Sequence, residues 1–191
     1  MKKILMLTLA VALLAGVRAS AASMEDVDGG VGVKLGWFQI DDETETFGGV
    51  GSAGMNFDAA LSYQVDYDWY VDGGNGAWNL SLLFTSADVS TTGLIAGFEG
   101  DADLWQLAVN RKWYLDTQAA GPHTGWYLGG GLGYSSAKVS LSDNTGTTVS
   151  SSDTSLDINT LAGYEWPCGG LAEMLWVVDE SSLGLSVGYR F

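Results

Sequence analysis

The fold class of this chain is decided by one stretch of its sequence, Met55-Asn56-Phe57-Asp58-Ala59-Ala60-Leu61-Ser62-Tyr63-Gln64-Val65-Asp66-Tyr67-Asp68-Trp69. The odd positions carry apolar or aromatic side chains, and the even positions carry mainly small polar or acidic ones. This repeat of two is the period of a β-strand, whose successive side chains point to opposite faces. The stretch exceeds the usual strand of about 5–6 residues. It is long enough for a tilted strand that crosses a bilayer, which needs about 9–11.

Seven further segments follow the same alternation: 31–37, 78–85, 105–115, 126–135, 156–166, 171–178 and 183–191. The pattern is ambiguous in 171–178, and Arg111 falls on the apolar side of its segment. A period of two rather than 3.6 predicts an all-β fold. We expect an eight-stranded antiparallel up-and-down transmembrane β-barrel.

The first residues have the pattern of a secretory signal peptide. Lys2 and Lys3 precede a short apolar run at 4–15, and Ala19-Ser20-Ala21 matches the small-x-small cleavage pattern. We therefore expect a signal peptide at 1–21 and one outer-membrane β-barrel domain at 22–191. The alternative is a retained amphipathic helix.

Charge and residue counts exclude several kinds of function. The chain has 8 Lys and Arg against 23 Asp and Glu, a formal net charge of −15. This balance argues against nucleic-acid binding by phosphate neutralisation, which needs a basic face, and against docking by charge onto anionic lipid. One Cys allows no internal disulfide, and one His excludes a His-rich zinc site. We expect no metal and no cofactor.

Three features indicate that the apolar face points outward, towards lipid. The polar face consists of small side chains, which suit a narrow lumen better than a surface in water. The connections at 41–54, 87–103 and 138–154 are longer than those on the other side, as the outer loops of membrane barrels are. The tryptophans fall near the strand ends, where membrane-interface aromatics gather; they are Trp37, Trp69, Trp78, Trp105, Trp113, Trp126, Trp166 and Trp176. A soluble ligand-binding barrel is the alternative if the faces are reversed.

Together these features resemble the eight-stranded outer-membrane β-barrels of the OmpA-transmembrane, OmpX and OmpW kind, over roughly residues 30–191. The end of the sequence, Val187-Gly188-Tyr189-Arg190-Phe191, resembles the insertion signal of such barrels, carried here by Val187, Tyr189 and Phe191. The resemblance implies export through the periplasm to the bacterial outer membrane. It also implies contact with outer-membrane lipid and lipopolysaccharide, recognition of the C-terminal strand by the barrel-assembly machinery, and a monomer.

The polar face carries charges that would lie inside the barrel. Closure places the last strand next to the first, which brings Arg190 and Lys34 close to the acidic second strand. A charge in a narrow lumen needs a partner or water. We therefore expect a lumen network of ion pairs formed by Lys34, Asp58, Asp66, Lys112, Asp157, Glu165, Glu173 and Arg190. The alternative is a catalytic or gating site, because paired carboxylates can also do acid–base chemistry.

Three functions are compatible with this sequence. The first is a non-enzymatic structural or surface-interaction protein with a narrow ion-paired lumen. The second is a small porin-like channel for ions or small solutes, since Gly129, Gly131 and Gly133 would leave part of the lumen unfilled. The third is a lipid A-modifying enzyme. It ranks last because His123 lies in an expected periplasmic turn, away from the lipid A leaflet, and is expected to be solvated. We expect no enzymatic activity.

Overall fold

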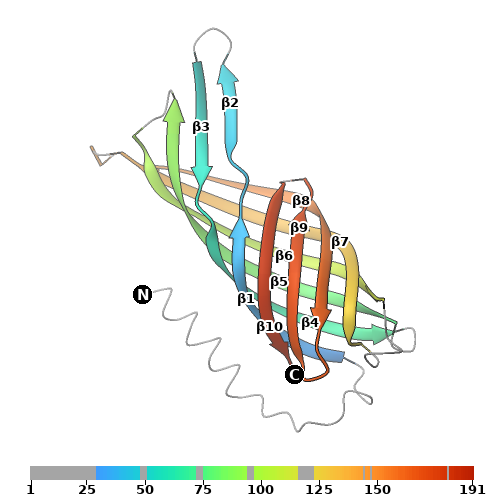
Figure 1. Cartoon of the computed structure of the whole chain (residues 1–191). Coiled ribbons are helices and arrows are strands. Elements are labelled where there is room, and N and C mark those ends of the chain that lie inside the picture. Colours follow the sequence, from blue (N-terminus) through green and yellow to red (C-terminus); the bar gives the residue numbers. More distant parts are fainter. Residues whose placement is uncertain are drawn as a thin grey trace.

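The computed structural model describes residues 29–47, 51–71, 75–93, 97–115, 123–143, 145–146, 148–179 and 181–191. The expected signal peptide at 1–21 lies outside these residues. Within the described ranges, no helix is long and apolar enough to cross a membrane. The described chain is built from antiparallel strands (Figure 1).

The strands are β1 (Gly29–Gln39), β2 (Glu43–Phe47), β3 (Gly51–Phe57), β4 (Ala60–Val71), β5 (Gly76–Gly93), β6 (Glu99–Tyr114), β7 (Gly125–Ser142), β8 (Thr148–Glu165), β9 (Gly170–Val177) and β10 (Ser182–Arg190). Eight of them form a ring in the order β1-β4-β5-β6-β7-β8-β9-β10, and the pairing of β10 with β1 closes it. Members of the ring follow one another along the chain, with β2 and β3 as an excursion between β1 and β4. The predicted eight-stranded up-and-down barrel is therefore confirmed.

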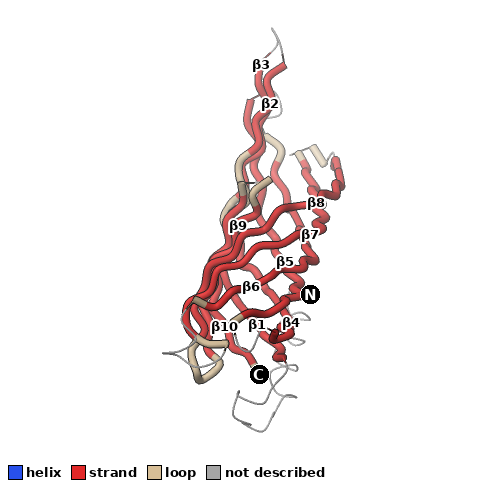
Figure 2. The backbone as a smooth tube through the Cα atoms, turned by 90° about the vertical axis from the view of Figure 1, so that its right-hand side faces the viewer, coloured by secondary structure: helices blue, strands red, loops and turns tan. Residues whose placement is uncertain are grey.

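The strands β2 and β3 form a hairpin that projects beyond one end of the ring (Figures 1 and 2). The strands β5 to β8 are also long, at 16 to 18 residues each. The segments 41–54, 87–103 and 138–154 are thus mostly strand, and their prediction as loops is wrong. Ladder hydrogen bonds join backbone groups and need no particular side chain, so a Ser-, Thr- and Gly-rich segment extends a strand as an apolar one does.

The stretch that decides the fold is two strands, β3 and β4, separated at Asp58 and Ala59. Phe57 pairs with Val89 and Ser62 pairs with Thr85, so five steps on one strand match four on the other. One extra residue on one strand is a β-bulge, and a slip of one residue turns the side chains to the opposite face. Phe57 is therefore buried inside, whereas the simple alternation places it on the lipid face.

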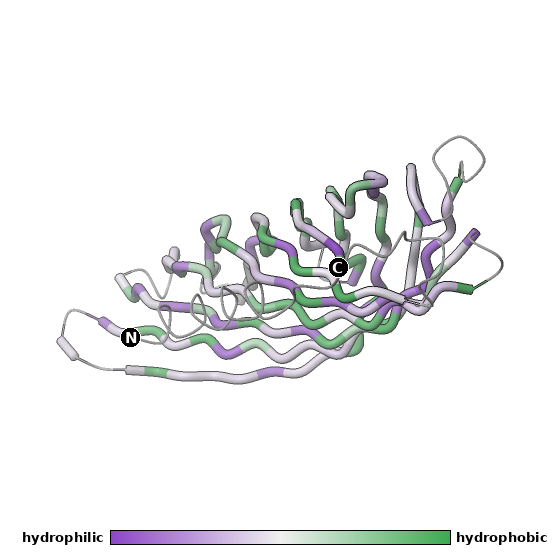
Figure 3. Tube along the Cα trace, turned by 90° about the horizontal axis from the view of Figure 1, so that it is seen from below, coloured by the Kyte–Doolittle hydropathy of each residue, from purple (hydrophilic) through white to green (hydrophobic). Residues whose placement is uncertain are grey.

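The exterior of the ring is apolar. Figure 3 shows apolar and polar residues alternating along the strands. All eight Trp side chains lie on the exterior, with exposed fractions from 37% for Trp105 to 66% for Trp37. Aliphatic side chains such as Leu107, Leu132 and Ile158 are exposed as well. A surface of this kind is unfavourable in water and matches the lipid-facing band of a membrane barrel.

The interior is filled in layers, which we name from the end that holds the C-terminus (Figure 1) towards the projecting hairpin. The aromatic floor contains Tyr70, Tyr114, His123 and Tyr127. The charged layer follows, and then a neutral layer with Asn79, Gln106, Asn110 and Asn159. An apolar cluster of buried side chains lies beyond it.

Candidate functional site

The charged layer contains three cations and four carboxylates. They are Lys34 of β1, Asp66 and Asp68 of β4, Lys112 of β6, Glu165 of β8, Glu173 of β9 and Arg190 of β10. Every one of these side chains is at most 1% exposed. Three positive and four negative charges leave a formal charge of −1 in the layer.

Asp66 lies at the centre of the charged layer. Its Oδ2 atom is 3.1 Å from Nζ of Lys34, 3.4 Å from Nη2 of Arg190 and 3.7 Å from Nζ of Lys112. One carboxylate oxygen therefore faces all three cations of the layer.

The remaining ion pairs extend from these three cations. Lys34 pairs with Glu173, and Arg190 pairs with Asp68. Nη1 of Arg190 also donates to Oε2 of Glu165 over 2.9 Å. The cations and carboxylates thus connect six strands of the ring across the lumen.

Neutral groups add hydrogen bonds to two of the carboxylates. The hydroxyl of Tyr114 donates to Glu165 over 3.1 Å, and that of Tyr127 donates to Glu173 over 2.8 Å. Nζ of Lys112 lies 4.9 Å from the ring centroid of Tyr127, at cation–π distance. Buried charges are tolerated when they are paired and hydrogen-bonded. Every charge of the layer is paired, and among its described atoms only Oδ1 of Asp66, Oε1 of Glu165 and Nε of Arg190 have no hydrogen-bond partner.

The structure brings together six of the eight side chains predicted for the lumen network. Asp157 is buried in the neutral layer, where Gln106 and Ser155 donate to its carboxylate. Asp58 is exposed beside the bulge, on the outside with Asp88, so its predicted place in the network is wrong. The extra residue of the bulge turns Asp58 away from the lumen.

Asp68 is the member of the charged layer that the sequence prediction omits. Its Oδ2 atom lies 3.2 Å from Nζ of Lys112. The signal for this role is present in the sequence, because Asp68 occupies an even position of the alternation, two residues after Asp66.

The three lumen-facing glycines of β7 do not leave open volume. The space next to Gly131, Gly133 and Gly129 is taken by Asn110, Gln106 and Leu161, respectively. A Cβ atom at any of these glycines would collide with or crowd its neighbour. The prediction of an unfilled lumen at this wall is therefore wrong.

The apolar cluster closes the lumen beyond the neutral layer. It consists of Phe38, Leu83, Leu104, Leu161, Leu175 and Val177. These residues come from β1, β5, β6, β8 and β9, on different sides of the ring, so apolar side chains meet across the lumen. The sequence analysis missed this cluster. Its signal is the apolar residue that interrupts an otherwise polar face, as Leu83 and Leu175 do.

The exposed aromatic side chains contact one another near both ends of the strands. At the C-terminal end Trp69 pairs with Trp78 in register, and Trp126 packs edge-on against a neighbouring tyrosine. At the other end the ring centroids of Trp105 and Tyr134 are 5.8 Å apart. The guanidinium carbon of Arg111 lies 5.4 Å from the ring centroid of Trp78, which gives this cation an aromatic partner on the outer face.

His123 lies under the charged layer and is buried, with an exposed fraction of 8%. Its ring stacks on that of Tyr70, with centroids 3.7 Å apart, and meets the ring of Tyr114 edge-on. The prediction of a solvated turn residue is therefore wrong. Burial lowers the pKa of His123 below its usual value, and the carboxylate of Asp68 opposes this shift.

The three residues predicted to form the insertion signal lie at the closing strand. Val187 and Tyr189 are 65% and 45% exposed on the exterior. The backbone N–H of Phe191 donates to the carbonyl of Val31 over 2.9 Å, which ties the end of β10 to β1. The exposure of these side chains is compatible with recognition by another protein, and the role stays a prediction.

No protein-family model matches the sequence, and a search of curated proteins gives no significant match. Solved structures do match. The crystal structure of Ail, the attachment invasion locus protein of Yersinia pestis, in complex with the heparin analogue sucrose octasulfate has a TM-score of 0.57 at 17% identity, covering 86% of this chain and 100% of that one. The crystal structure of Neisserial surface protein A has a TM-score of 0.51 at 14% identity, covering 86% and 96% of the two chains.

At such identities the likeness concerns the fold. The two matched proteins are β-barrels whose strands align with nearly the full ring described above. The closed ring, the apolar exterior and the aromatic residues at both strand ends agree with it. Together these features identify the fold of the chain as that of an eight-stranded outer-membrane β-barrel.

Proposed function

We propose that this chain is a non-enzymatic, non-conducting barrel of the bacterial outer membrane that acts through its outer surface. The observation that carries this proposal is the closure of the lumen at two successive levels. An ion on its way through the barrel would have to displace the buried pairs of the charged layer. It would then have to cross the apolar cluster, where a constriction of this kind keeps water out.

The strand extensions supply the outer surface. The hairpin of β2 and β3 and the far ends of β5 to β8 continue beyond the part of the ring whose exterior is apolar, which we call the apolar band. Exposed carboxylates gather there, among them Asp58, Asp88, Glu99 and Asp101. An acidic surface of this kind favours a basic partner by charge complementarity.

The other predicted sites fit supporting roles in the same proposal. The charged layer would stabilise the barrel from inside, and the eight tryptophans would fix its depth among lipid and lipopolysaccharide. Val187, Tyr189 and Phe191 would present the C-terminal strand to the barrel-assembly machinery. We infer a monomer, because the ring pairs all eight of its strands and leaves none of its edges open.

The environment of the imidazole supports a non-enzymatic role. A general base must reach the proton that it removes. His123 is covered by the rings of Tyr70 and Tyr114 on the inside of the floor, and this position suits packing better than proton transfer to a lipid.

The test is single-channel conductance of the refolded protein in planar bilayers. We expect no discrete steps from the wild-type protein, even though it is folded. A variant with Phe38→Ala, Leu104→Ala and Arg190→Ala removes side chains from both levels, and once circular dichroism shows it folded it serves as the control that conduction is detectable. Reproducible cation-selective steps from the wild-type protein would overturn the proposal and favour the channel function.

The surface role is tested in nanodiscs of neutral lipid, with immobilised polylysine as the basic probe. We expect binding to polylysine and none to polyglutamate, with empty nanodiscs as the blank. The triple variant Asp88→Asn, Glu99→Gln, Asp101→Asn should lose most of the binding. Equal binding by the variant and the wild-type protein would contradict a role for this acidic surface.

A further inference from the structure

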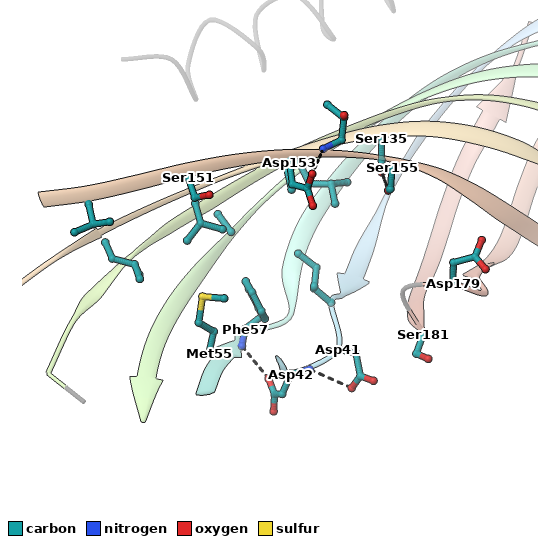
Figure 4. A pocket seen from close by; sticks show the side chains of 18 residues that line it. Asp41, Asp42, Met55, Phe57, Ser135, Ser151, Asp153, Ser155, Asp179 and Ser181 are labelled. Carbon is teal, nitrogen blue, oxygen red and sulfur yellow. Dashed lines mark hydrogen bonds between the residues drawn. The ribbon is translucent and has the colours of Figure 1, made fainter. Parts of the chain in front are cut away.

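The mouth of the barrel holds a cavity of about 580 Å³ beyond the apolar cluster (Figure 4). Its walls come from β3, β6, β7 and β8, from the junction of β1 with β2, and from the turn between β9 and β10. We call this cavity the vestibule. Its size falls within the range of about 300–1,000 Å³ that is typical of small-molecule sites.

The inner part of the vestibule is apolar. Leu104 of the apolar cluster lies at its inner end. Its sides are lined by Met55, Phe57, Val139 and Leu141. The bulge after β3 is what turns Phe57 inward to this position. A ligand that enters the vestibule therefore buries an apolar body against these side chains.

The rim of the vestibule carries four carboxylates, those of Asp41, Asp42, Asp153 and Asp179. Figure 4 shows Asp41 and Asp42 on one side of the cavity and Asp153 across from them. Carboxylates that face a common space from opposite walls create a negative potential within it.

Backbone donors orient the rim carboxylates. The N–H of Phe57 donates to Oδ1 of Asp42 over 2.9 Å, and the N–H of Ile158 donates to Oδ2 of Asp179 over 2.9 Å. The N–H of Thr154 holds Oδ1 of Asp153 in the same way, over 2.8 Å. Each carboxylate is thus fixed through one oxygen, and its second oxygen can serve a ligand.

No basic side chain of the described residues lines the vestibule. Three of the described cations, Lys34, Lys112 and Arg190, belong to the charged layer, and Arg111 lies against Trp78 on the exterior. Lys138 is exposed and alternates with the lining residues on β7. The negative charge of the rim is therefore left for a ligand to balance.

We propose that the vestibule binds a small organic cation with an apolar body, such as a quaternary ammonium on an aromatic group. The apolar body would contact the inner walls, and the cationic head would lie among the rim carboxylates. A metal ion is the less suitable occupant, because within the described ranges no three His, Cys, Asp or Glu side chains are arranged to hold one. The proposal goes beyond the surface role and does not depend on it.

The test is titration calorimetry on the protein in nanodiscs of neutral lipid, with benzyltrimethylammonium as the probe. We expect a dissociation constant in the range of about 0.1–1 mM. Tetramethylammonium lacks the apolar body and should bind at least about tenfold more weakly. Benzenesulfonate has a similar ring and the opposite charge, and it should not bind.

Substitution by asparagine removes a rim charge and keeps the oxygen that accepts the backbone N–H. Asp153→Asn and Asp179→Asn should each weaken binding about threefold, and the double variant about tenfold. Asp103→Asn removes the same charge from an exposed position that does not line the vestibule, and it is expected to leave binding unchanged. Ser151→Trp should block the vestibule from its exposed rim without affecting the fold.

Three results would overturn the proposal. Equal binding of benzyltrimethylammonium and tetramethylammonium would show that the apolar walls contribute nothing. An equal loss in Asp103→Asn and Asp153→Asn would assign the binding to diffuse surface charge. Unchanged binding in Ser151→Trp would place the probe elsewhere. Each variant is first checked for wild-type circular dichroism, so that a misfolded barrel is not counted as a loss of binding.

Discussion

Gly32 of β1 pairs in register with Asp66 of the neighbouring strand β4, and the Asp66 carboxylate occupies the space that a side chain at Gly32 would need. A Cβ atom at Gly32 would lie only 1.9 Å from Oδ1 of Asp66. A Cβ atom at Gly188 of β10 would lie 2.2 Å from the carbonyl oxygen of Val33 and 2.7 Å from Cγ of Lys34. The charged layer fits into a narrow ring because glycines on neighbouring strands make room for its side chains.

This relation predicts that Gly32→Ala destabilises the barrel. The added methyl group has to displace the carboxylate that faces all three cations. Overpacking of this kind typically costs about 1–3 kcal/mol. We expect a lower midpoint in urea unfolding from lipid vesicles, followed by tryptophan fluorescence. Gly170→Ala is the matched control, since a Cβ atom there meets its nearest neighbour at an ordinary 3.4 Å. Equal midpoints for the two variants would contradict the argument.

Removal of Arg190 should destabilise the barrel more strongly. Arg190→Ala leaves the carboxylate of Glu165 without its cation and that of Asp68 with Lys112 alone, inside a layer whose formal charge changes from −1 to −2. Breaking a buried ion pair on one side costs about 3–5 kcal/mol. We expect a large drop in the urea midpoint or in folding yield. Arg111→Ala, which removes an exterior cation, should have a small effect.

A second variant separates lost pairing from lost packing. Asp68→Asn in the Arg190→Ala background returns the formal charge of the layer from −2 to −1 and keeps the size of the side chain. Part of the lost stability should return, so that the double variant loses less stability than the sum of the losses in the two single variants. Additive losses would mean that Arg190 acts through its volume.

The period of two in the sequence was enough to predict the ring and the inward face of most strands. It could not reveal the bulge at Asp58 and Ala59, because two adjacent alanines leave the apolar pattern readable on either side of the slip. The period also shows which face of the sheet a side chain occupies, but not its position along the barrel axis. For that reason Asp157 could be placed inside the barrel but not distinguished from the charged layer, and its hydrogen bonds to Gln106 and Ser155 became visible only in three dimensions.

The strand extensions were missed for a related reason. The segments beyond the apolar band lack a lipid-facing side, so their alternation carries little contrast between the two faces. Ser150 and Ser152, for example, pair in register with Ser140 and Lys138 of β7 through the backbone alone. Side-chain patterns therefore define the part of a strand within the membrane better than the part outside it.

Burial of His123 predicts a pH dependence of stability. Its pKa in the folded barrel lies below the usual value of 6.5, which the unfolded chain should retain. As the pH falls through about 6.5, the unfolded chain takes up its proton first, so stability decreases until the pH lies below the lower pKa of the folded barrel. His123→Asn removes this dependence, and asparagine accepts the left-handed backbone found at this position (φ 58°). Unfolding midpoints at several pH values provide the measurement. A wild-type profile as flat as that of the variant would contradict the assignment.

An arginine substitution should have different effects on stability inside the apolar band and in the strand extensions beyond it. Leu132 of β7 is 67% exposed in the middle of the band, whereas Ser152 of β8 is exposed beyond it, opposite Lys138. An arginine on the lipid face near the midplane costs about 2–4 kcal/mol, and one near the interface about 0–1 kcal/mol. We therefore expect Leu132→Arg to lower the unfolding midpoint in lipid vesicles strongly and Ser152→Arg to leave it nearly unchanged. The contrast should shrink in detergent micelles, because a micelle adapts more easily around a charge than a bilayer does. Similar losses at both positions in vesicles would mean that the membrane covers the extensions as well, and they would no longer be available as an outer surface.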